Sequence, residues 1–274
     1  MAAEAQGGKV NEQELMDAFA SLEPMGDAEP PRYTWERHRW EMRRHVRRDP
    51  IAGFLNWPTV TATMFAGETA FIRSELEALR AQPDWESLWL PAILDSGVGQ
   101  APRMSGEPSA NANMVHQAFH LMIWNKATLR EVRDLETVTE FGGGYGAMAL
   151  VASRLGFRGT WRMVDFPEMC LLQSYYLSQH ELGCGVEFSP VLERLGADLY
   201  VACYSLSETP WEQRYGFLDT SANSFLLAFQ EHWDEIDNLR WLEKEVVDWS
   251  VFNRRWHIFP MVRPGHWYAM GGMR

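Results

Sequence analysis

A run of glycines between two apolar segments constrains this chain more than any other feature. Residues 138–150 are VTEFGGGYGAMAL, in which four glycines fall within five positions after a short extended segment and before an apolar helical pattern. Glycine allows a positive φ and lets a ligand approach the backbone. A strand that enters a glycine-rich turn and continues as a helix is the nucleotide-binding geometry of α/β folds. We therefore expect a ligand at this turn.

The spacing of the glycines leaves two cofactors open. Gly142, Gly144 and Gly146 form G-x-G-x-G, whereas the dinucleotide fingerprint would place its third glycine at Ala147, a substitution that it tolerates. An NAD site therefore stays possible, as does a turn that only joins two elements. The acidic Glu140 before the glycines favours the other cofactor, because E-x-G-G-G-x-G resembles the first motif of the class I S-adenosylmethionine-dependent methyltransferases.

A second acid supports a nucleoside cofactor. Asp165 ends the next predicted strand, 160–165, a little over twenty residues after Gly142. A cofactor with an adenosine ribose needs a carboxylate at such a strand end to accept hydrogen bonds from the ribose hydroxyls. The alternative role of Asp165 is the N-cap of a helix that begins at Pro167.

Three segments together resemble a known family. EFGGGYG at 140–146, VDFPE at 164–168 and QSYYL at 173–177 are similar to the sugar O-methyltransferases of bacterial polysaccharide and natural-product clusters, and residues 57–60 and 113–116 are similar more weakly. The resemblance implies S-adenosyl-L-methionine as cofactor and a Rossmann-like methyltransferase sheet, mostly parallel, with an antiparallel last strand. The cofactor-binding residues that it implies are Glu140, Gly142, Gly144, Tyr145, Gly146, Asp165, Phe166 and Ser205.

The resemblance also implies a role for each part of this site. Glu140 and the glycines would wrap the methionine portion, Asp165 would hold the ribose, and Phe166 would pack near the adenine. Tyr145 lies inside the loop, with its side chain free to face the cofactor or the acceptor. Ser205 follows a predicted strand, where this fold places residues beside the sulfonium.

Composition excludes several other classes. The 274 residues carry a formal net charge of −12, which argues against nucleic-acid binding. The three cysteines form neither a disulfide framework nor a C-x-x-C metal site. Because the chain shows neither a membrane-spanning segment nor a signal peptide, we expect a soluble, cytoplasmic protein.

The chain divides into a tail and two larger parts. Residues 1–32 resemble a flexible tail, residues 33–134 an N-terminal helical lobe, and residues 135–274 the cofactor-binding domain. The helix expected over 33–48 carries six arginines and is either a solvated basic face, which we favour, or an anion or oligomer contact. An accessory lobe of this kind is compatible with a homodimer.

The second part alternates strands and helices, as a parallel sheet requires. Its last two strands, 256–262 and 266–270, are joined by Pro264-Gly265, a tight turn that predicts an antiparallel pair. A helix is expected over 235–249.

Methyl transfer to a hydroxyl needs a base near the acceptor oxygen. By position after predicted strands, we expect the catalytic base to be His232 or Glu208. His116, on a long helix expected over 110–129, is a candidate acceptor-binding residue or base, or a core histidine. The carboxylates at 231–237 suit a divalent cation, but the macrodipole of the expected helix also explains them, so no metal is assigned.

The sequence therefore predicts an S-adenosylmethionine-dependent O-methyltransferase acting on a sugar or glycosylated small molecule. An N- or C-methyltransferase of secondary metabolism, an NAD-dependent oxidoreductase and a non-catalytic binding protein are the alternatives. The tryptophans at 57 and 124 could form a sugar-stacking wall or belong to the core.

Overall fold

A computed structural model describes residues 3–4, 8–26, 30, 34–191, 196–218, 222–248 and 254–273. Its strands are β1 (Ala3–Glu4), β2 (Thr137–Phe141), β3 (Thr160–Val164), β4 (Gly185–Ser189), β5 (Leu199–Cys203), β6 (Ser224–Gln230), β7 (His232–Trp233), β8 (Ile236–Asp237), β9 (Arg254–Pro260) and β10 (His266–Met273). Its helices are α1 (Glu12–Ala20), α2 (Trp35–Arg48), α3 (Pro58–Thr63), α4 (Ala70–Arg80), α5 (Leu90–Ile93), α6 (Ala112–Thr128), α7 (Ala147–Arg154), α8 (Pro167–Ser178), α9 (Trp211–Leu218) and α10 (Asn238–Asp248). Short 3-10 or π turns lie at η1 (Ile51–Asn56), η2 (Trp85–Trp89) and η3 (Val132–Asp134).

Within the described residues, eight strands form one sheet in the order β1-β4-β3-β2-β5-β6-β10-β9. The neighbours from β4 to β6 are parallel. Strand β10 is antiparallel to both β6 and β9. The predicted fold class is thereby confirmed: an α/β sheet, mostly parallel, with an antiparallel end and N-terminal helices.

The burial of the strands agrees with their positions in the sheet. Strands β5 and β6 are apolar along almost their whole length and lie in the interior of the sheet, as parallel strands covered on both faces do. The order in which the chain adds strands changes direction between β2 and β5. Strands β3 and β4 are added on one side of β2, and β5 and β6 are then added on its other side. Ligands bind at such a switch point, outside the carboxyl ends of the strands.

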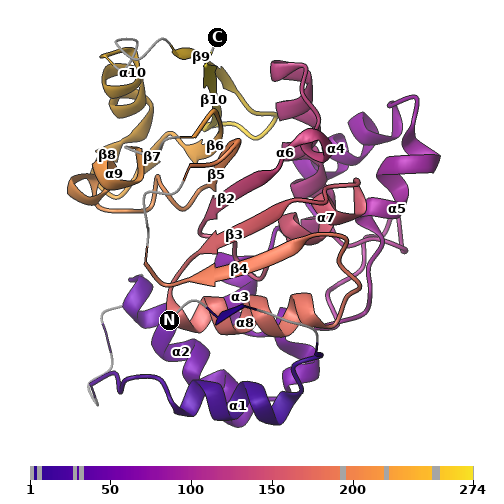
Figure 1. Ribbon diagram of the computed structural model, residues 1–274, viewed down its shortest axis with the longest axis vertical. Helices are drawn as coiled ribbons and strands as arrows, with labels where there is room; N and C mark the ends of the chain where they lie inside the picture. The colour runs from indigo at the N-terminus through magenta and orange to yellow at the C-terminus, as the bar shows by residue number, and fades with distance from the viewer. Residues whose placement is uncertain are drawn as a thin grey trace.

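The N-terminal helices pack against the helices of the sheet domain. Figure 1 shows α1, α2 and α3 beside α8 at one edge of the sheet, with α4 and α5 near α6 and α7. Polar side chains start several of these helices: Asn11 caps α1, Thr34 caps α2, and Asn111 caps α6.

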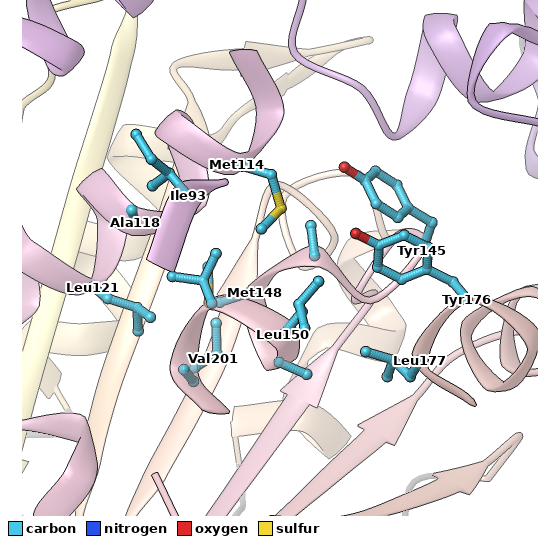
Figure 2. Packing of buried hydrophobic residues seen from close by; sticks show 14 of the residues in the cluster. Ile93, Met114, Ala118, Leu121, Tyr145, Met148, Leu150, Tyr176, Leu177 and Val201 are labelled. Carbon is cyan, nitrogen blue, oxygen red and sulfur yellow. The ribbon is translucent and has the colours of Figure 1, made fainter. Parts of the chain in front are cut away.

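One continuous apolar core joins the helical lobe to the sheet. Its residues come from α1 and α4 through α6 to α7, α8 and the central strands. Figure 2 shows Met114 of α6 and Ile93 of α5 packing toward Met148 and Leu150 of α7. Both Trp57 and Trp124 are buried in this core, so neither forms an open wall for a sugar.

The segment expected to be a tail contains a docked helix. In α1, Leu15 and Phe19 are buried against α8. The Val10 amide donates to Ser178 Oγ (3.0 Å), and Gln179 Nε2 donates to the Val10 carbonyl (2.7 Å). The expected boundary between tail and lobe, at residues 32 and 33, lies outside the described residues.

The basic helix α2 differs from the solvated face that we favoured from its sequence. Arg39 and Arg43 both donate to the buried carboxylate of Glu168 in α8, at 2.8 and 2.6 Å. Met42 and Val46 are buried beside them. The sequence pattern concealed this arrangement because the partner acid lies more than 120 residues away. No helix in the described parts of the chain has the length and apolar character needed to cross a membrane.

Candidate active site

The glycine loop joins β2 to α7 in the geometry that its spacing predicts. Gly142, Gly144 and Gly146 have φ values of 73°, 58° and 98°, which L-residues rarely adopt. A Cβ at Gly142 would lie 2.2 Å from the Cβ of Ser205, so the two strand ends meet there without room for a side chain. The Ser205 hydroxyl donates to the Phe141 carbonyl and holds the ends of β2 and β5 together.

Glu140 is a buried acid directly beneath this loop. Its side chain is 4% exposed, and its Oε2 accepts a hydrogen bond from Trp161 Nε1 at 2.7 Å. A Cβ at Gly143 would lie 2.9 Å from the same Oε2, so the carboxyl group touches the loop backbone. Burial raises the pKa of Glu140 to about 7, and the nearby Asp165 adds to the rise. A cation bound in the loop would stabilise the ionised form.

Asp165 follows β3 and is tied to the same loop. Its Oδ2 accepts from Gln173 Nε2 at 2.8 Å, and the same nitrogen donates to the Gly144 carbonyl at 3.0 Å. Burial raises the pKa of Asp165 to about 7, although hydrogen bonds from Phe166 and Gln173 oppose the rise. The alternative N-cap role is not observed: the N-cap of α8 is Phe166, with no side-chain cap bond. The structure therefore brings Glu140, Asp165 and the glycines together at adjacent strand ends.

Phe166 and Tyr145 point in different directions. Phe166 is 37% exposed and lies between Arg39, whose guanidinium carbon is 4.9 Å from the ring centroid, and Trp35, whose ring is 5.9 Å away. Tyr145, expected to lie free inside the loop, instead packs into the core beside Tyr176, as Figure 2 shows. Its hydroxyl accepts from Asn113 Nδ2 at 3.0 Å. A tyrosine ring buries enough apolar area to favour this inward position.

The two expected bases lie in different surroundings. Glu208 follows β5, accepts from Gln230 Nε2 at 3.4 Å, and has its pKa raised to about 7 by burial. It lines an open cavity of about 230 Å³ whose rim includes Trp211 and Trp233. His232 lies on β7 with 63% of its side chain exposed, 3.6 Å from the Glu231 carboxylate. Among the described residues, His232 therefore has no buried partner that would orient it.

The carboxylates at 231–237 lie in a hairpin rather than in a helix. Strands β7 and β8 pair antiparallel there, and α10 begins only at Asn238. The helix expected from 235 therefore starts three residues later, because Asn238 donates its amide to the Glu231 carbonyl and closes the hairpin; its expected end at 249 lies outside the described residues. The N-terminus of α10 accounts for Asp237, whose Oδ1 accepts from the Arg240 amide at 2.9 Å, but not for the acids earlier in the hairpin. Among the described residues, no three His, Cys, Asp or Glu side chains are arranged to hold a metal ion.

His116 belongs to a buried polar cluster near the end of β5. It lies on α6, is 6% exposed, and its Nδ1 is 2.8 Å from Glu75 Oε2 of α4. The ring of Tyr204, the residue after β5, stacks on it at 6.3 Å between centroids. The sequence singled out His116 but not Glu75.

Sequence reasoning also gave no role to Gln173 and Trp161. Gln173 falls inside the QSYYL segment, which contributed to the family resemblance, but the sequence indicated no function for this residue. Trp161 lies opposite Val138 in the register of β2 and β3, and Glu140 lies two residues further along β2 on the same face, so the sequence alone does not show that the two side chains meet. Glu75 does carry a signal: it lies three residues after Ile72 and four before Leu79, on the buried face of α4.

Comparisons with known proteins do not assign the chain to a family. No family model and no curated protein matches it. The structure of the 16S rRNA methylase ArmA is similar with a TM-score of 0.42 and 10% identity, over 59% of this chain and 86% of that one. The glycopeptide N-methyltransferase MtfA, complexed with S-adenosyl-L-methionine, gives 0.39 and 11%, over 50% and 81%. Human N-acetylserotonin methyltransferase, in complex with the same molecule, gives 0.39 and 14%, over 85% and 70%. These values are too low to carry a conclusion about the chemistry of this chain.

Proposed function

We propose that this protein is an S-adenosyl-L-methionine-dependent methyltransferase. The observation that carries the proposal is the carboxyl group of Glu140 against the glycine loop, beside the second acid, Asp165. A pyrophosphate in this loop would meet a carboxylate at close range, which opposes an NAD site. The methionine portion of S-adenosylmethionine instead carries an ammonium and a sulfonium, and both favour an ionised Glu140.

The remaining residues fit the other parts of that cofactor. Asp165 stays partly exposed and could accept hydrogen bonds from the ribose hydroxyls, while Gln173 fixes its carboxylate. Phe166, which is 37% exposed beside Arg39 and Trp35, offers part of an aromatic ring for the adenine. Four of the five residues from 142 to 146 are glycines, so the methionine portion would meet loop backbone rather than side chains, and the cofactor would supply an electrophilic methyl group at this end of the sheet.

We further propose that the acceptor atom is a hydroxyl oxygen of a sugar or glycoside. Support comes from the resemblance in residues 140–177 and from the cavity beside Glu208, where Trp211 and Trp233 offer apolar faces for a sugar ring. The acidic chain would act on a small molecule rather than on nucleic acid or a membrane, in the cytoplasm, and as a homodimer. Sedimentation of the purified chain tests the dimer, and cell fractionation tests the compartment.

Thermal shift with two ligands tests the cofactor. S-adenosylhomocysteine should raise the melting temperature and NAD should not; the reverse pattern would establish an oxidoreductase. The atom methylated is tested by mass spectrometry of products from hydroxyl and amine acceptors. A product with only N- or C-methyl groups would replace O-methylation by the alternative methyltransferase class, and bound cofactor without transfer to any acceptor would favour a binding protein.

Asp165→Ala tests the ribose assignment. The variant should bind S-adenosylhomocysteine about 10- to 100-fold more weakly in calorimetry, because hydroxyls left without an acceptor cost about 1–3 kcal/mol. Asp134→Ala, which removes an exposed carboxylate, is the control and should bind as the parent does. Equal affinity of the Asp165 variant and the parent would show that another group holds the ribose.

A further inference from the structure

Tyr204 connects the glycine loop to the buried polar cluster around His116. It follows β5 directly and has a φ of 71°, a strained conformation for a tyrosine. Its chain neighbour Ser205 meets Gly142, and its own ring stacks on His116. His116 is thus placed beside the carboxyl end of β5, where an acceptor would meet the methyl group.

Glu75 and His116 form a buried pair with one open end. Glu75 is 3% exposed and accepts only one hydrogen bond in the described part of the chain, from His116 at 2.8 Å. Because a carboxylate can only accept, we assign the proton of the neutral imidazole to Nδ1 and the lone pair to Nε2. The hydrogen bond to Glu75 uses Nδ1, and Nε2 of His116 makes no hydrogen bond within the described residues. The pair therefore holds the imidazole in one orientation and leaves one ring nitrogen free to accept a proton.

The neighbouring histidines lack this arrangement. His120 lies one turn further along α6 and bonds its Nδ1 to the Tyr268 hydroxyl at 2.7 Å, and no carboxylate of the described segments bonds to it. Burial lowers its pKa well below the usual value, and that of His266 to about 4. The titratable and charged side chains that surround His116 are Glu75 of α4, His120 of α6, Tyr204 after β5, Arg263 before β10, and His266 and Tyr268 of β10.

We propose that His116, oriented by Glu75, is the general base that deprotonates the acceptor hydroxyl. The inference rests on the proposed function and names a base other than His232 or Glu208. His116 Nε2 takes the hydroxyl proton while a bond forms between the acceptor oxygen and the methyl carbon. The bond from that carbon to sulfur breaks, and its electron pair remains on the sulfur as a neutral thioether. Glu75 stabilises the imidazolium, so Glu75 is a positioning residue and His116 a catalytic one.

The test uses the full chain, tritium-labelled S-adenosylmethionine and a panel of p-nitrophenyl glycosides. His116→Gln should lower kcat about 100- to 10,000-fold, the usual contribution of a general base, with the affinity for S-adenosylhomocysteine unchanged. Glu75→Gln should lower kcat by a smaller factor and leave the KM for the glycoside unchanged, because the imidazole loses the carboxylate that orients it. His180→Gln, which removes a half-buried imidazole on the turn after α8, is the matched control and should stay within about threefold of the parent.

Each outcome decides between the two proposals. A parent that binds no S-adenosylhomocysteine refutes the proposed function and, with it, this inference. An active parent whose activity survives His116→Gln refutes the inference alone. If the parent binds S-adenosylhomocysteine but methylates none of the glycosides, nitrogen-15 NMR of the histidines decides: we expect the Nδ1–H tautomer at His116, and a proton on Nε2 would overturn the assignment. Circular dichroism of each variant separates lost chemistry from lost folding.

Discussion

Replacing Glu140 by glutamine should make the protein more stable above neutral pH and flatten its stability profile. The substitution keeps a side-chain oxygen that can accept from Trp161 Nε1 but removes the ionisable group. Glutamine has nearly the volume of glutamate, so the packing against Gly143 is preserved. The difference between the two proteins therefore measures the unfolding free energy that is lost when this buried acid ionises.

The sign and size follow from the pKa of Glu140, which burial raises from 4.5 to about 7. Between these two values the folded chain holds a proton that the unfolded chain has lost, so stability falls as the pH rises. Each pKa unit corresponds to about 1.4 kcal/mol, so this group should remove about 3 kcal/mol of unfolding free energy between pH 4 and pH 8. The Glu140→Gln variant should not show this decrease in unfolding free energy.

Urea unfolding of the cofactor-free protein, followed by tryptophan fluorescence from pH 4 to pH 8, measures the difference. Asp165, Glu208 and other acids titrate in both proteins, so subtracting the two profiles leaves the Glu140 contribution together with its coupling to Asp165. Glu136→Gln, at an exposed position just before β2, is the control, and its profile of stability against pH should match that of the parent. Parallel profiles for the parent and the Glu140 variant would refute the reasoning.

Two further substitutions test contacts on either side of the site. Gly142→Ala should cost about 1–3 kcal/mol of stability and weaken cofactor binding, because its Cβ would meet Ser205 at a strained φ; Ser205→Gly should restore part of the loss in a melting assay. Glu168→Gln should cost about 3–5 kcal/mol in urea unfolding, because Arg39 and Arg43 would lose the carboxylate that they share.

Matched substitutions at open positions serve as controls for both. Gly106→Ala meets no atom within 4 Å and should be nearly neutral. Glu77→Gln breaks a surface pair with Arg80, in which Glu77 is 69% exposed, and should cost less than about 1 kcal/mol. A Gly142 or Glu168 variant as stable as its control would contradict the contact assigned to it.

The local signals in the sequence predicted most of the fold. The glycine loop, the strand before it and the helix after it depend on a few adjacent residues and were found where expected. The final Pro-Gly hairpin was also found, although its first strand, expected over 256–262, spans Arg254–Pro260. Errors arose where a distant partner decides the structure. The arginines of α2 seemed solvated because Glu168 lies far along the chain, and the helix expected from 235 begins late because the Glu231 carbonyl pairs with Asn238.

The candidate site divides in the same way. Glu140, Asp165 and the glycines belong to short motifs, so their proximity could be inferred from the rule that parallel strands end at one edge. Glu75 and His116 are 41 residues apart in the sequence and lie on two different helices, and no local pattern specifies their contact. His232 was selected by its place after a strand, but the direction of a side chain at a hairpin depends on a pairing that the sequence does not display.

The continuous core that joins the helical lobe to the sheet domain affects how the folded protein opens locally. Because α4 and α6 share buried side chains with α7 and the central strands, opening one lobe exposes apolar surface of the other, and both belong to one cooperative unit. A ligand that binds only the folded loop stabilises the whole of such a unit by mass action. Cofactor bound at residues 142–146 would therefore slow amide exchange in helices that never touch it.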